Sequence, residues 1–135
     1  MARQIGRPNP TSQARLQLIL IALAVWDLLV FVFELTNTRL LEIEDIDGLL
    51  GARAVGGTTA VLAIAYLYAA RNPIRHRFVL WLASLEQFVA LFSCTFHLAR
   101  SDINLGEAVV PIAVAAVFLV LLMTNLPRQT DVVGV

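Results

Sequence analysis

Residues 16–35 read LQLILIALAVWDLLVFVFEL, and Asp27 and Glu34 are the only charged side chains among them. A helix needs about 20 mostly apolar residues to cross the hydrocarbon core of a bilayer. The run is continuously apolar rather than alternating, which argues against a transmembrane strand. It therefore predicts a spanning helix. Because the run is longer than a typical signal-peptide core, we expect it to remain uncleaved.

Three further apolar runs of similar length lie at residues 52–70, 78–98 and 108–126. The 135-residue chain is 59% hydrophobic and 15% charged, and a soluble domain of this size could not hide that much apolar surface. The sequence thus predicts an all-α fold, a four-helix transmembrane bundle that forms one integral membrane domain over residues 1–135. The connections between the second, third and fourth runs are short, so these neighbours should pack antiparallel. Pro111 should fall in the first turn of the last helix.

The arginines predict the orientation of the bundle, because cytoplasmic loops carry an excess of basic residues. The chain has no lysine, and its ten arginines divide unequally between the two sides that four spans define. One side has Arg3, Arg7, Arg15, Arg71, Arg75, Arg77 and Arg128, and the other has Arg39, Arg53 and Arg100. We therefore expect both termini in the cytoplasm (N-in/C-in) and the protein in the inner membrane.

The basic loop 71–77 is the clearest orientation signal, and we expect its side chains to contact lipid head groups. These contacts would come from Arg71, Arg75, His76 and Arg77. Tyr66, Tyr68 and Trp81 fall near the same boundary, where aromatic residues form a belt.

The longest connection, residues 36–51, is acidic and is expected on the outer side. Its apolar residues recur at roughly helical spacing, which is typical of a short helix on the membrane surface. The segment Asp45-Ile46-Asp47-Gly48 is similar to part of a calcium-binding loop, but the closing glutamate is missing. We interpret it as a solvated acidic turn or a docking surface rather than a calcium site.

The third run carries a stripe of small and polar residues on one helix face. The spacing of its members alternates between three and four, and they are Ala83, Glu86, Ala90, Ser93, His97 and Arg100. The opposite face is Leu, Val and Phe. Charges inside a membrane cost roughly 2.5–3.5 kcal/mol on insertion scales, so this stripe should face the bundle and the apolar face should meet lipid.

The first run places a second acid near the depth of Glu86. At about 1.5 Å per residue, Asp27 lies about 16 Å and Glu86 about 12 Å from the inner boundary. Two carboxylates close together in a low dielectric cannot both ionise at small cost, so at least one is expected to hold a proton near neutral pH. Asp27 and Glu34 share one face of this helix, since they are seven residues apart.

Four charged or titratable residues fall near the outer boundary: Glu34, Arg53, His97 and Arg100. Glu34 closes the first run and Arg53 opens the second, so an ion pair between them is expected. With Asp27, Glu86 and Ser93, these residues form a predicted polar cluster inside the membrane. Two interpretations stay open. The cluster lines a cavity that opens outward, or its members satisfy one another and fix the helix register.

Neither metals nor cofactors are predicted. Cys94 is the only cysteine, which excludes an internal disulfide. His76 and His97 are separated by about 30 Å along a helix and so cannot ligate one haem iron. No nucleotide-binding loop and no serine nucleophile motif is present.

The segments Gly51-Ala-Arg-Ala-Val-Gly-Gly57 and Ala70-Arg-Asn-Pro-Ile-Arg-His-Arg77 carry a family resemblance. The chain resembles small bacterial four-helix membrane proteins of the DoxX-like and related groups over the second and third runs, about half its length. The resemblance implies a four-helix fold and a membrane location. It also implies a link to quinone-related redox complexes, although no residue here matches a quinone ligand.

We expect the protein to be a non-catalytic accessory or assembly component of a membrane complex, because the loops are short and catalytic motifs are missing. The alternative is a lipid- or quinone-binding protein, or an enzyme, that uses the predicted polar cluster. The expected partners are the lipid bilayer and other membrane subunits or a second copy of the chain. Nucleic acid is not an expected partner, since the net charge is zero.

Overall fold

The computed structural model describes residues 10–37 and 46–126, and this part of the chain is helical with no strand. The helices are α1 (Pro10–Asn37), α2 (Ile46–Ala70), α3 (Arg77–Ala99) and α4 (Leu105–Asn125). Each contains a stretch long and apolar enough to cross a membrane. Large apolar side chains such as Leu18, Phe78 and Phe92 are mostly exposed, as they are where hydrocarbon is the solvent. The protein is therefore a multi-pass membrane protein.

Two helix starts differ from the predictions. Helix α2 begins at Ile46, so the last residues of the predicted loop 36–51 are helical; residues 38–45 lie outside the described part. Pro111 lies inside α4 rather than in its first turn. The reason is a capping box in which Asn104 Oδ1 accepts from the Glu107 amide while Glu107 Oε2 accepts from the Asn104 amide. This box starts the helix before the apolar run does.

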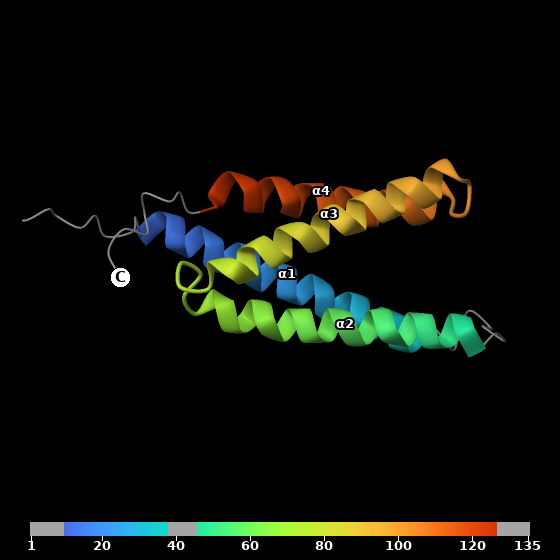
Figure 1. Ribbon diagram of the computed structural model, residues 1–135, viewed down its shortest axis with the longest axis horizontal. Coiled ribbons are helices and arrows are strands. Elements are labelled where there is room, and N and C mark those ends of the chain that lie inside the picture. The colour runs from blue at the N-terminus through green and yellow to red at the C-terminus, as the bar shows by residue number, and fades with distance from the viewer. Residues whose placement is uncertain (1–9, 38–45, 127–135) are drawn as a thin grey trace, which may run out of the picture.

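The four helices form two pairs, α1 with α2 and α3 with α4 (Figure 1). The pairs meet at the end that holds the start of α1, the turn between α2 and α3, and the end of α4. They separate toward the opposite end, which we call the open end. The prediction that α2 packs along α3 is wrong, because the two helices contact each other only briefly. Helix α1 packs along α2 instead.

Small residues explain the close contact between α1 and α2. A Cβ atom on Gly56 would stand 3.3 Å from the Cβ of Glu34 and 3.5 Å from the Phe31 ring, so only glycine fits without displacement. Gly57 has nothing within 4 Å of the same position. Of this adjacent pair, only Gly56 therefore permits the close approach of the two helices.

The main cluster of buried side chains fills the half of the bundle where the pairs meet. Toward the open end, the last buried side chain of α1 is Asp27, and the last one of α3 is Gln87, next to Glu86. Beyond this level, α1 and α3 have no buried side chain among the described residues. Polar residues therefore stand where the core ends and the separation of the pairs begins.

Candidate functional site

The deepest polar groups of the bundle converge on the carboxyl of Glu86. The Tyr66 hydroxyl of α2 donates a hydrogen bond to Glu86 Oε2. Gln87 Nε2 donates to the same oxygen at 3.2 Å. Asp27 of α1 lies within electrostatic range of both Glu86 and Tyr66. We call Asp27, Tyr66, Glu86 and Gln87 the polar floor.

One oxygen of the polar floor lacks a partner. Asp27 is only 2% exposed, and its Oδ2 atom accepts no hydrogen bond from any described residue. Leaving a buried polar atom unsatisfied costs about 1–3 kcal/mol, more for a charged group. The two donor groups of the polar floor, the Tyr66 hydroxyl and the Gln87 amide, both bond Glu86, and neither bonds Asp27 Oδ2. A buried polar atom without a partner is rare in folded proteins, so Asp27 Oδ2 requires an explanation.

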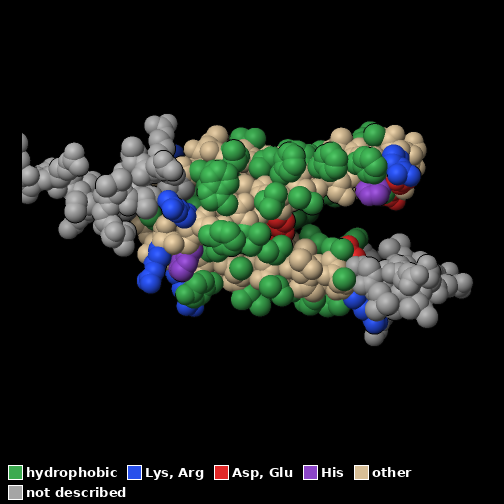
Figure 2. Space-filling model, viewed as in Figure 1, with side chains coloured by type: hydrophobic (Ala, Val, Ile, Leu, Met, Phe, Trp, Pro, Cys, Tyr) green, Lys and Arg blue, Asp and Glu red, His purple; other side chains and the backbone are tan. Residues whose placement is uncertain are grey.

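The polar floor lies at the base of a cleft between the two helix pairs. Figure 2 shows the hollow between the pairs toward the open end, with acidic side chains visible inside it. The burial pattern agrees, since the buried side chains of α1 and α3 stop at Asp27 and Gln87. The cleft continues from the polar floor to the open end of the bundle.

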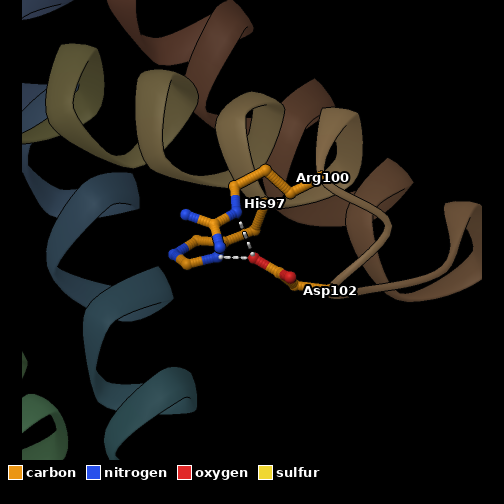
Figure 3. Close-up of polar contacts among 3 residues, drawn as sticks. All are labelled: His97, Arg100 and Asp102. Carbon is orange, nitrogen blue, oxygen red and sulfur yellow. Dashed lines mark hydrogen bonds and ion pairs between the residues drawn. The ribbon is translucent and has the colours of Figure 1, made fainter.

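A second polar cluster lies on α3 and the turn that follows it, at the open end. His97 Nδ1 lies 2.9 Å from Asp102 Oδ2, and Arg100 Nε lies 3.4 Å from the same oxygen (Figure 3). These side chains lie on the side of α3 that faces α1. The Arg100 guanidinium also lies 5.5 Å from the centre of the Phe96 ring, within the range of a cation–π contact. We call His97, Arg100 and Asp102 the rim cluster.

The backbone at the end of α3 explains the position of Asp102. The Ser101 amide bonds the Leu98 carbonyl, and the Asp102 amide bonds the His97 carbonyl, which together form a Schellman motif. This motif needs a left-handed residue after the helix, and Ser101 takes that role with φ 61°. The tight turn brings the Asp102 carboxyl back over the last turn of α3.

Four members of the predicted polar cluster are divided between the polar floor and the rim cluster. Asp27 and Glu86 lie together in the polar floor, whereas His97 and Arg100 lie in the rim cluster with Asp102. The predicted ion pair between Glu34 and Arg53 is wrong, because no ion pair joins these two described side chains; Arg53 is exposed and Glu34 packs near Gly56.

The predicted stripe of α3 faces the interior over only part of its length. Ala83 is buried, Glu86 and Ala90 are half-buried, and Ser93, His97 and Arg100 are exposed. The separation of the pairs explains this change, since it uncovers the open half of α3. The apolar face of α3 is exposed as expected, with Leu85, Phe88 and Phe92 each more than half accessible.

Three residues of the polar floor and the rim cluster escaped the sequence analysis. Tyr66 was predicted in the interfacial aromatic belt, but its ring is fully buried and its hydroxyl donates a hydrogen bond to Glu86. Gln87 lies one position away from the small and polar stripe of α3, so the spacing of the stripe did not select it. A polar amide within a spanning helix nevertheless indicates a position that faces the bundle interior. Asp102 lies in a turn whose geometry depends on a serine with positive φ, where glycine is typical.

The basic residues predicted to meet head groups gather at the end where the helix pairs join. Arg71, Arg75 and Arg77 are exposed, and the His76 ring lies 4.9 Å from the ring of Tyr68. Basic side chains are visible around this end in Figure 2. No described group of three or more His, Cys, Asp or Glu side chains is arranged to hold a metal ion.

Comparison of the chain with protein-family models, with curated proteins and with solved structures finds no match. The resemblance to DoxX-like proteins therefore stays a prediction. The geometry of the cleft and its polar residues is the basis for a functional proposal.

Proposed function

We propose that this protein binds an amphipathic molecule with a hydroxyl head group in the cleft between its helix pairs. The head group reaches the polar floor, where it hydrogen-bonds to the carboxyls of Asp27 and Glu86. The apolar body lies between the pairs and contacts lipid. The observation that carries this proposal is the buried, unpartnered Oδ2 atom of Asp27 at the base of the cleft.

A hydroxyl is the head group that fits these carboxyls best. A carboxyl accepts hydrogen bonds when ionised and also donates one when protonated, and a hydroxyl can both donate and accept. It therefore satisfies Asp27 in either protonation state. A purely apolar molecule would leave Oδ2 unsatisfied, and an anionic head group would be repelled by whichever carboxyl is ionised.

The proposal includes the orientation of the bundle. Both termini lie in the cytoplasm, which follows from the excess of arginine at that end, including the exposed Arg71, Arg75 and Arg77. The cleft then opens toward the outer leaflet, with the rim cluster at the outer head-group level. The ligand enters laterally from that leaflet.

Extraction of the purified protein tests the proposal. Wild-type protein in mild detergent should release one hydroxyl-bearing amphiphile, at close to one molecule per chain, when its solvent extract is quantified by mass spectrometry. Glu86→Gln should raise the Kd of the ligand at least tenfold and so lower the amount retained, since tenfold corresponds to about 1.4 kcal/mol and a hydrogen bond to a charged group contributes more.

Glu107→Gln is the matched control. It makes the same chemical change on α4, and glutamine also serves in a capping box, so ligand and fold should be retained. Equal losses in the two variants would contradict the proposal. So would a wild-type extract without such a molecule, as expected if the cleft instead holds a helix of a larger complex in which this chain is an accessory subunit.

A further inference from the structure

A separate groove runs along the outside of the α1/α2 pair, at the end where the pairs join. It has a volume of about 520 Å³ and is lined by Ala14, Gln17, Leu18, Ile21, Leu67, Ala70 and Arg71. The lining residues of α1 share one face of that helix, Leu67 and Ala70 share one face of α2, and Arg71 follows directly in the turn. The groove contains no residue of the polar floor or the rim cluster and is a different site from the cleft.

The groove is apolar along most of its length and open to lipid. Leu18 is 68% exposed, Ile21 is 43% exposed and Leu67 is 44% exposed. From Ala14 to Ile21 it follows α1 for about 10 Å, at about 1.5 Å per residue. A surface of this shape and chemistry fits an acyl chain that lies along the two helices.

The polar end of the groove offers hydrogen-bond donors that have no side-chain partner in the described part of the chain. The Arg71 guanidinium forms no ion pair with a described acid, and the Gln17 side chain has no hydrogen bond to a described residue. Arg15 is exposed one position after Ala14, and three further basic residues follow in the 71–77 turn. No described acid lies among the lining residues, so the charge around this end is positive.

The geometry points to a binding site for one anionic phospholipid in this groove. Its phosphate accepts hydrogen bonds from Arg71 and Gln17, and one of its acyl chains lies against Leu18, Ile21 and Leu67. Charge complementarity selects the lipid class, because a planar guanidinium binds phosphate and the surrounding arginines favour a net negative head group. The site lies at the membrane boundary. There the head group of one lipid reaches the polar end of the groove, and its acyl chain lies along the apolar part.

Native mass spectrometry of the full chain from mixed vesicles of phosphatidylglycerol and phosphatidylcholine tests the site. Wild-type protein should retain one phosphatidylglycerol in preference to phosphatidylcholine. Arg71→Gln should lower this preference about fivefold, which corresponds to the roughly 1 kcal/mol that one arginine contributes near a charged surface. Arg71→Lys should keep most of the preference, since the charge remains.

Arg75→Gln is the matched control, since Arg75 is exposed on the same turn but does not line the groove. It should change the preference by less than twofold. Leu18→Trp fills the groove and should reduce retention of both lipids. Equal effects of Arg71→Gln and Arg75→Gln would overturn the site in favour of general attraction to a basic surface, and so would full retention in Leu18→Trp. None of these results depends on the cleft ligand.

Discussion

Asp27→Leu is expected to stabilise the bundle by about 1–3 kcal/mol while it abolishes ligand retention in the cleft, because a buried polar atom without a partner costs about that much. Asp27 is 2% exposed, and its Oδ2 atom has no donor among the described residues. Leucine has similar branching and removes the unsatisfied atom. The gain is measured by unfolding the ligand-stripped protein in detergent micelles, because bound ligand would itself stabilise the wild type.

Asp27→Asn provides the comparison for this experiment. An amide keeps an acceptor and adds donors, so its stability should stay within about 1 kcal/mol of the wild type. Destabilisation by Asp27→Leu would mean that the carboxyl is satisfied within the bundle and fixes its packing. That result would favour the structural interpretation of the polar floor over the binding one.

Gly56→Leu is expected to lower stability by about 3 kcal/mol, because overpacking of a closely packed contact costs about 1–3 kcal/mol and sometimes more. A Cβ at this position would already stand 3.3 Å from the Glu34 Cβ, and the rest of a leucine side chain would meet the Phe31 ring. Helices α1 and α2 must then move apart. The same unfolding assay measures the loss.

Gly57→Leu is the control, since a Cβ there has open space within 4 Å. Leucine favours a helix over glycine by up to about 1 kcal/mol, so this variant should be neutral or more stable. Similar losses for the two leucine variants would contradict the close contact between α1 and α2 at Gly56.

The spans were predictable because a long apolar run is the strongest signal that a sequence carries. The predicted run 78–98 closely matches α3, which spans Arg77–Ala99. The predicted run 52–70 closely matches the apolar stretch Arg53–Ala70 of α2. The similar depth of Asp27 and Glu86 was also predictable, since the rise of a helix is constant. Their proximity in the structure follows from that depth and from the faces on which they lie.

The pairing of the helices was not predictable from the length of the connections. Helices α2 and α3 are joined by a short turn, yet the space between them holds the ring of Tyr66. Gly56 instead lets α1 approach α2 closely. The pairing of the helices depends on the shapes of such side chains. In the sequence, the position of Tyr66 near the end of a span indicated only a place at the membrane interface. The cleft, which results from this pairing, could therefore be identified only in the structure.

The most direct test of the central claim is the topology of the two described turns. In a Cys94→Ser background, Ile74→Cys and Ile103→Cys place one matched, half-buried cysteine in each turn. A membrane-impermeant maleimide should label residue 103 in intact cells and residue 74 only after permeabilisation. Labelling of both cysteines from the same side would contradict a bundle whose helix pairs cross the bilayer and open their cleft toward the outer leaflet.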